Sequence, residues 1–291
     1  MLQVARLAPR QLGESRDLVA AFLHRSLNPD GGFQNRAGES DLYYTVFGLE
    51  GLIALQEPLP VDAVAAYLGG FKDGAGLDFV HLACLARCWA ALSRDLEGVR
   101  APAIAARLET FRSADGGYAQ APDAPRGSVY ASFLALGAHE DLRVPLRDPD
   151  RLIHAIAALR AGDGGYANQP GDAQGVTTVT AAAVLLLRAL EGPIDPHLGM
   201  WLLDRCHPSG GFLATPAAPI PDLLSTATAL HALAALQVPL AGLHEACLDF
   251  VDSLWTNRGG FYGNWVDDAL DCEYTYYGLL ALGHLTIAAP P

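Results

Sequence analysis

The feature that most constrains the fold of this chain is a Gly-Gly-aromatic triplet that occurs six times among its 291 residues. The copies lie at residues 31–33, 69–71, 116–118, 164–166, 210–212 and 259–261. Successive copies are 38 to 49 residues apart, and a period of that length holds one supersecondary unit. Because glycine reaches positive φ at no steric cost, each pair predicts a sharp turn after a helix.

Two kinds of predicted helix flank these triplets. Amphipathic stretches precede them at residues 16–27, 61–68, 103–112, 150–160, 197–206 and 243–255. Nearly all-apolar stretches follow at residues 41–55, 78–92, 176–190, 222–236 and 271–285, whereas the register of the third repeat, around residues 126–136, does not follow from the pattern. A helix that is apolar all round must be buried on every side, but an amphipathic helix can face water.

This burial pattern predicts an all-α fold, an α6/α6 toroid in which six helix pairs form a closed barrel with an inner and an outer ring. All 291 residues are then expected in a single domain. The alternative is an open solenoid of helical pairs that serves as a binding scaffold. We favour the closed form because the last apolar helix is as hydrophobic as the others and does not resemble a polar capping repeat.

Composition excludes several classes of protein. With 51% apolar and 18% charged residues the chain is globular, and it has no apolar run of the roughly 18 to 20 residues that cross a membrane. A net charge of −13 disfavours nucleic acid as a partner. The N-terminus lacks the features of a secretory signal and the five cysteines lack a disulfide framework. We therefore expect a cytoplasmic protein with reduced thiols.

The apolar helices open with a second motif, Asp-x-x-x-Thr, at residues 41–45, 222–226 and 271–275. Together with the glycine triplets, over the whole chain, this motif resembles the repeat of the protein prenyltransferase β-subunit and squalene (class II terpene) cyclase superfamily. The resemblance implies a polyprenyl or other hydrophobic small molecule in a central cavity, and chemistry at the N-terminal ends of the inner helices.

The sixth repeat is similar to the Asp-x-Asp-Asp-Thr motif of class II terpene cyclases, in which the middle acid protonates a double bond. Here it reads Asp271-Cys-Glu273-Tyr-Thr275, so the resemblance implies Glu273 as the catalytic proton donor and Asp271 as its orienting partner. Such a donor must be neutral and desolvated. Tyrosines near this opening are expected to bind the substrate and to stabilise a carbocation through their ring faces: Tyr44, Tyr274, Tyr276 and Tyr277.

The zinc site of the related prenyltransferases, Asp-x-Cys in one inner helix and Asp-x-x-His in the next, is broken where family order places it. Leu224 and Tyr274 stand at the cysteine and histidine positions. Asp41 and His81, in the first two repeats, imitate the pattern, and Glu273 is a hypothetical third ligand. Zinc is therefore a possible cofactor, and a prenyltransferase of this kind normally works with a separate helical partner subunit.

Charge in the loops that precede the inner helices is uneven. Arg36, Lys72 and Arg126 belong to the first three repeats, whereas acids dominate the fifth and sixth. The cationic residues are expected to hold a diphosphate. The recurring Asp41, Asp78, Asp222 and Asp271 also have a structural interpretation as helix N-caps.

These observations favour an isoprenoid-processing enzyme with acid-initiated cyclisation. The alternatives are a zinc-dependent transferase similar to a prenyltransferase β-subunit, and a non-catalytic binder of a hydrophobic ligand or peptide.

Overall fold

The structure, a computed structural model, describes residues 1–92 and 101–288. Contacts divide the chain into two compact units: the first comprises Met1–Asn28, Phe33–Leu59 and Asp195–Pro291, and the second Pro29–Gly32 and Pro60–Ile194. Both units are helical, and the described ranges contain isolated β-bridges at the turns but no strand. No helix within these ranges is long and apolar enough to cross a membrane.

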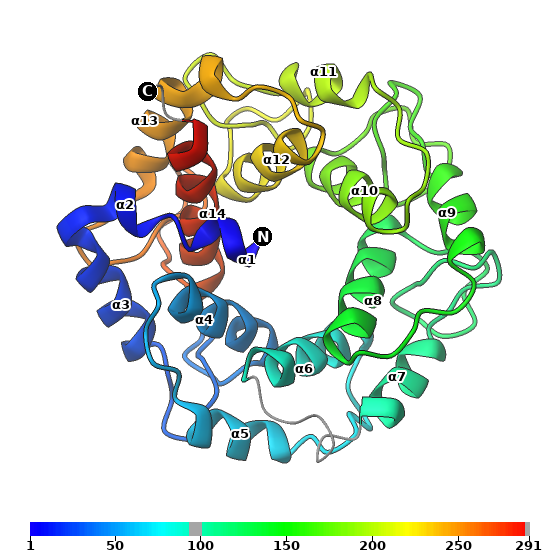
Figure 1. The fold of residues 1–291 in the computed structure, drawn as a ribbon, viewed down its shortest axis with the longest axis horizontal. Coiled ribbons are helices and arrows are strands. Elements are labelled where there is room, and N and C mark those ends of the chain that lie inside the picture. The colour runs from blue at the N-terminus through cyan, green and yellow to red at the C-terminus, as the bar shows by residue number, and fades with distance from the viewer. Residues whose placement is uncertain (93–100, 289–291) are drawn as a thin grey trace. The chain divides into compact units, whose positions relative to one another are not determined.

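The first unit places the last inner helix beside the first (Figure 1). Its helices, in chain order, are α1 (Leu2–Ala5), α2 (Pro9–Leu12), η1 (Gly13–Ser15), α3 (Arg16–Arg25), α4 (Leu42–Ala54), α11 (Leu198–Leu203), α12 (Leu223–Ala235), η2 (Ala241–Leu243), α13 (His244–Leu254) and α14 (Cys272–Ala288). Helix α14 contacts both α4 and α12, and the amphipathic helices α3, α11 and α13 pack on α4, α12 and α14. The sixth repeat therefore adjoins the first.

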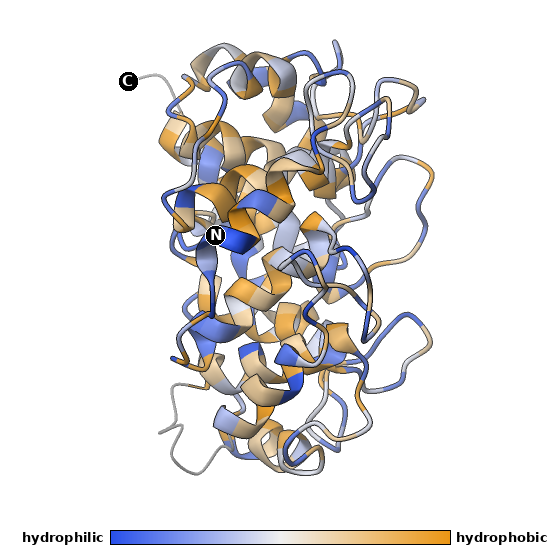
Figure 2. Cartoon of the chain, turned by 90° about the vertical axis from the view of Figure 1, so that its right-hand side faces the viewer, coloured by the Kyte–Doolittle hydropathy of each residue, from blue (hydrophilic) through white to orange (hydrophobic). Residues whose placement is uncertain are grey.

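The second unit repeats this pairing of helices. It contains α5 (Val61–Gly69), α6 (Phe79–Ala91), α7 (Ala101–Glu109), α8 (Val129–Asp141), α9 (Pro149–Ala157) and α10 (Thr177–Ala189). Helix α8 contacts both α6 and α10, while α5 packs on α6 and α7 packs on α8. In both units the helices are largely hydrophobic, and hydrophilic residues are frequent in the connecting segments (Figure 2).

In the first and fifth repeats, a threonine hydroxyl in the first turn of the inner helix accepts a hydrogen bond from the preceding glycine turn. The backbone N–H of Phe33 donates to Thr45 Oγ1 at 3.0 Å, and that of Phe212 donates to Thr226 Oγ1 at 2.9 Å. A buried N–H without a partner costs about 1–3 kcal/mol. The threonine of the repeat motif is thus explained by the turn that it satisfies.

The third repeat follows the same plan with different residues. Ser128 caps α8 by accepting from the N–H of Ala131 at 3.1 Å, and Ser132 Oγ accepts from the N–H of Tyr118 at 3.1 Å. Serine replaces both the aspartate and the threonine of the motif, which is why the sequence pattern did not reveal the register of this helix.

The second repeat differs from the expected turn at residues 69–71. Gly69 ends α5, and Gly70 has a helical φ of −63°. The positive φ values belong instead to Lys72, at 54°, Gly74, at 78°, and Gly76, at 87°. Leu82 occupies the position of the motif threonine and has no hydroxyl to hold a turn, so the chain reverses later in the loop.

Candidate functional site

The aspartates that open the inner helices all act as N-caps. Asp41 Oδ1 accepts from the N–H of Tyr43 at 2.7 Å, and Asp78 Oδ1 accepts from that of His81 at 2.9 Å. Asp222 and Asp271 accept in the same way from Ser225 and Tyr274, at 2.7 and 2.8 Å. Capping satisfies a free N–H of the first turn, so the recurrence of aspartate here has a structural cause.

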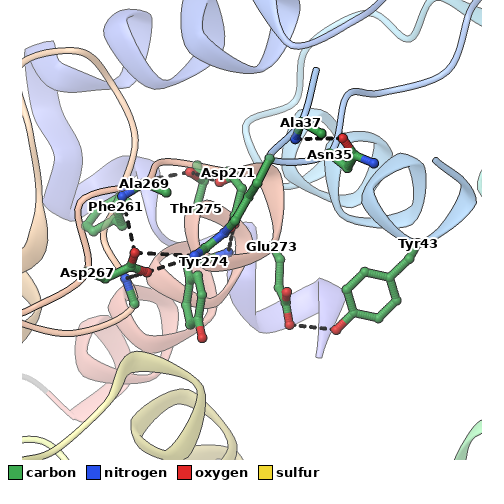
Figure 3. A network of polar contacts seen from close by, with 12 residues as sticks. Asn35, Ala37, Tyr43, Phe261, Asp267, Ala269, Asp271, Glu273, Tyr274 and Thr275 are labelled. Carbon is green, nitrogen blue, oxygen red and sulfur yellow. Dashed lines mark hydrogen bonds and ion pairs between the residues drawn. The ribbon is translucent and has the colours of Figure 1, made fainter. Parts of the chain in front are cut away.

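Asp271 has a second role, because Arg36 reaches it from the loop of the first repeat. Arg36 Nε donates to Asp271 Oδ2 at 2.7 Å, and its terminal nitrogens contact Asp267 at 2.9 and 3.3 Å (Figure 3). The Asp271 side chain is only 2% exposed. The guanidinium thus joins the first repeat to two carboxylates of the sixth.

Burial and charge act against each other in this cluster. Burial opposes the charge of Arg36, but hydrogen bonds to Asp267 and Asp271 outweigh it and raise the pKa of the guanidinium. The pKa of Asp267 is lowered, because hydrogen bonds from Arg36 and from backbone N–H groups exceed its desolvation. The pKa of Asp271 is raised, since its burial exceeds the contributions of Tyr274 N–H and Arg36.

Glu273, two residues after Asp271, is directed toward Tyr43 of α4 (Figure 3). The hydroxyl of Tyr43 donates to Glu273 Oε1 at 2.6 Å. Desolvation raises the pKa of Glu273 to about 7; the Asp271 charge adds to this, whereas the Tyr43 hydrogen bond and Arg36 oppose it. A carboxyl group with that pKa retains its proton in a large share of molecules at neutral pH.

Aromatic rings from α4 and α14 continue from this carboxyl. Tyr43 contacts Tyr44 and Phe47 edge to face, with ring centroids 5.6 and 5.0 Å apart. Phe47 in turn contacts Tyr276 and Tyr277 at 5.9 and 5.5 Å. The predicted Tyr44, Tyr276 and Tyr277 are therefore members of one aromatic cluster beside Glu273.

The fourth predicted tyrosine, Tyr274, packs under the guanidinium of Arg36, whose central carbon lies 5.4 Å from the ring centroid. A Cβ at Gly263 would come within 2.6 Å of this ring, so the loop needs glycine there. Desolvation and neighbouring acids, Glu273 first among them, raise the pKa of Tyr274 to about 12. Desolvation also raises the pKa of Tyr44.

The expected cationic residues do not share one environment. Arg36 was expected to hold a diphosphate, but its guanidinium is engaged by Asp267 and Asp271, which compete for the same donors. Lys72 and Arg126 are exposed and belong to the second unit. Their role in binding a diphosphate stays a prediction.

Asp41 and His81, the residues predicted to bind zinc, each have a local hydrogen-bond partner. Asp41 caps α4, and His81 Nδ1 pairs with Asp78 Oδ2 at 2.9 Å. Zinc binding by these two residues stays a prediction. Across residues 1–92 and 101–288, no three His, Cys, Asp or Glu side chains gather in an arrangement that could hold a metal ion.

Sequence reasoning missed Tyr43 as a member of the site. The available signal was the expected closure of the ring, because a residue in the first turn of the first inner helix then faces the first turn of the sixth.

Comparison with known proteins assigns the family. The model of the prenyltransferase alpha-alpha toroid domain matches residues 14–76, 61–206 and 196–288. The chain belongs to this family. The match confirms both the α/α toroid predicted from the burial pattern and the resemblance to the prenyltransferase and cyclase superfamily.

Individual relatives agree with this assignment. Drimenyl diphosphate synthase of Streptomyces showdoensis is 30% identical over 241 residues, which cover 75% of this chain and 44% of the relative. The chain thus spans less than half the length of that curated protein.

Two solved structures share the fold at low sequence identity. A type II terpene cyclase from Scytonema, in complex with geranylgeranyl dihydroxybenzoate, has a TM-score of 0.65 and 16% identity over 97% of this chain and 98% of that chain. Protein geranylgeranyltransferase-I of Candida albicans, complexed with GGPP, has a TM-score of 0.66 and 14% identity over 93% of this chain and 90% of that chain.

Proposed function

We propose that this protein is an acid-initiated terpene cyclase, in which Glu273 protonates a double bond of a polyprenyl diphosphate. The observation that carries the proposal is the environment of Glu273. It is a desolvated carboxyl with a raised pKa that accepts a hydrogen bond from Tyr43 beside an aromatic cluster. Proteins similar to this chain include terpene cyclases and a prenyltransferase, and the name of the curated relative specifies a product that retains a diphosphate.

Tyr43 and Asp271 have different proposed effects on Glu273: Tyr43 determines which oxygen carries the proton, and Asp271 favours its retention. Because Tyr43 donates to Oε1 of Glu273, the other oxygen, Oε2, is the one that we propose carries the proton to the substrate. Asp271 is paired with Arg36, so its negative charge is held near Glu273 and disfavours a second ionised carboxylate. Glu273 is then the member of the pair that carries the proton.

In the reaction, the π electrons of the double bond take the proton from Oε2, which leaves Glu273 as a carboxylate and the neighbouring carbon as a tertiary cation. The next double bond attacks this cation to close a ring, and loss of a proton elsewhere gives an isomer of the substrate. Tyr44, Tyr274 and Tyr277 present aromatic faces suited to a cation, worth about 0.5–2 kcal/mol each.

The diphosphate is proposed to bind Lys72 and Arg126, two exposed cations of the predicted set. Replacing both by alanine is expected to weaken binding of farnesyl diphosphate at least tenfold, because each removes a charge-assisted contact. Calorimetric titration with the diphosphate and with farnesol measures the effect. Equal losses for the two ligands would contradict this role.

The decisive experiment is incubation of the purified protein with farnesyl and geranylgeranyl diphosphates in H₂O and in D₂O, with products analysed by mass spectrometry. We expect a cyclic isomer of the substrate that gains a single deuterium in D₂O and keeps its diphosphate. Release of pyrophosphate without deuterium uptake overturns the proposal in favour of prenyl transfer. A thermal shift with these ligands but no product would instead identify a binding protein.

A further inference from the structure

Two histidines that the proposed protonation step does not use meet between α12 and α14. Nδ1 of His231 and Nε2 of His284 are 2.9 Å apart, and the ring centroids are 5.0 Å apart. His284 is 2% exposed, whereas His231 is partly exposed. A neutral imidazole has one N–H and one acceptor nitrogen, so one ring donates a hydrogen bond to the other.

The position of His231 on α12 relates it to Glu273 on α14. From residue 223 to residue 233, every residue of α12 is buried except Leu224 and His231. These two are seven residues apart and so lie on the same face of the helix. Leu224 holds the position in the fifth repeat that Glu273, also partly exposed, holds in the sixth. His231 thus extends, along α12, the face to which Glu273 belongs on α14.

The separation of the two groups follows from the helix geometry. Leu223 N, at the start of α12, donates to Gly263 O in the loop before α14 at 2.8 Å. Later turns of the same helices meet at His231 and His284, so the two helices run in the same direction. Seven residues at 1.5 Å each place His231 about 10 Å beyond the level of Glu273 along the helix axis. An isoprenoid chain that folds into rings is long enough to contact both groups.

Both rings are neutral at pH 7, as a base must be before it takes up a proton. Burial lowers the pKa of His231 to about 3 and that of His284 to about 4. A neutral imidazole has a lone pair on the nitrogen that carries no proton. The low pKa values do not prevent proton uptake from a carbocation, because a carbocation is a far stronger acid than an imidazolium.

We propose that His231 is the general base that ends the cyclisation and that His284 positions it, an inference that rests on the acid-initiated function proposed above. In the tautomer that this role requires, Nδ1–H of His231 donates to Nε2 of His284, so Nε2 of His231 is the acceptor. The last carbocation gives this nitrogen a proton from a carbon next to its cationic centre. The electrons of the broken C–H bond form a double bond in the product.

The hydrogen bond between the two rings persists through this step. His231 becomes an imidazolium whose Nδ1–H still donates to His284, now as a charge-assisted hydrogen bond. The proton then passes from His231 to water, and Glu273 regains a proton from water before the next turnover. Each cycle therefore consumes one proton and returns one, as the formation of an isomer requires.

The test compares the products of the unchanged protein with those of H231N and H231F, with geranylgeranyl diphosphate in D₂O. Neither replacement can take up the proton, but asparagine keeps a donor for His284. Deuterium should still enter the product because Glu273 is intact. We expect the share of cyclic alkene to fall about tenfold or more. Cyclic alcohols should replace it, because water captures a cation that has lost its base.

The role of His284 is tested by H284Q and H284L. Glutamine offers an acceptor oxygen near the position of Nε2, so H284Q should retain the alkene, whereas H284L should shift the products toward the alcohol. H197F is the control, since the His197 side chain is 87% exposed; it should give the products of the unchanged protein. Circular dichroism verifies the fold of each variant.

Three results would count against the proposal. Unchanged product ratios in H231N and H231F would overturn it and leave the acid-initiated function intact. Identical ratios in H284Q and H284L would overturn the positioning role of His284. Absence of any cyclic product from the unchanged protein would overturn both the base and the acid.

Discussion

The first turns of α12 and α14 share the same hydrogen-bonded arrangement, but their aspartates make different further contacts. In each, an aspartate caps the helix and a threonine four residues later accepts from the N–H of the phenylalanine in the glycine turn. At α12 the second carboxylate oxygen of Asp222, Oδ2, accepts from the hydroxyl of Ser225 at 2.7 Å, within the same helix turn. At α14 the corresponding oxygen of Asp271 receives Arg36 from the first repeat.

The residue two positions after the aspartate differs as well. It is Leu224 in α12 and Glu273 in α14. Both aspartates have a pKa raised by burial, so burial alone does not distinguish them. The comparison teaches that the cap and the threonine belong to the scaffold, whereas Glu273 and the contact with Arg36 of the first repeat are specific to the sixth repeat.

The largest expected effect is that of Glu273→Gln. The amide cannot supply the proton, so turnover should fall at least about 1,000-fold, within the range for loss of a general acid. Product formation from geranylgeranyl diphosphate measures it, with circular dichroism to verify the fold. Glu245→Gln, an exposed change in the first turn of α13, is the control and should retain activity. Substantial turnover in Glu273→Gln would exclude this residue as the donor.

The next effect contrasts Asp271→Asn with Asp222→Asn. Asparagine caps helices about as well as aspartate, so both variants should fold. Asp271→Asn removes the partner of Arg36 and the charge that raises the pKa of Glu273, so kcat should fall about 10- to 100-fold at pH 7 with a smaller change in KM. Asp222→Asn should stay within about threefold. Similar losses in both variants would mean that Asp271 is only a cap.

A smaller effect is expected in the pH profile. With an acid of pKa about 7, kcat/KM should fall about tenfold per pH unit above that value, because only the protonated form reacts. The Tyr43 hydrogen bond lowers this pKa, so Tyr43→Phe should move the descending limb to higher pH. Tyr44→Phe is the control and should leave the limb in place. A limb displaced to lower pH by Tyr43→Phe would contradict the assignment.

The smallest effect is expected on stability, from the threonines that hydrogen-bond the glycine turns. Thr226→Val and Thr275→Val each remove the acceptor of a buried N–H and should reduce the free energy of unfolding by about 1–3 kcal/mol. The loss should be greater for Thr226, whose contact with Phe212 N is 2.9 Å, than for Thr275, whose contact with Phe261 N is 3.5 Å. Urea denaturation measures both. The reverse order would show that the hydrogen bonds do not determine the cost.

Periodicity was sufficient to predict the helices, because both their apolar spacing and their caps are local. The expected inner helix at residues 222–236 corresponds to α12, Leu223–Ala235. The sequence pattern failed in the third repeat, where Ser128 and Ser132 make the hydrogen bonds that aspartate and threonine make elsewhere. It also failed in the second repeat, where Leu82 has no hydroxyl to bond the glycine turn. These cases need the hydrogen-bond partner, which lies elsewhere in the chain.

The candidate site was predictable only in part for a related reason. The motif drew attention to Asp271 and Glu273, but not to the partners that determine their protonation. Arg36 was interpreted as a ligand for phosphate because its nearest acids are distant in sequence, and Tyr43 has no unusual spacing of its own. The roles of these residues follow from the contact between α4 and α14.

The contacts of Arg36 with Asp271 and of Tyr43 with Glu273 join residues 235 and 230 positions apart. During synthesis, at about 5–20 residues per second, the segment with Arg36 and Tyr43 emerges well before its acidic partners. An unfinished chain therefore contains the aromatic residues of α4 but no prepared acid. Assembly of the proposed proton donor coincides with the meeting of the first and last repeats, so a nascent or misfolded chain would lack the environment that raises the pKa of Glu273.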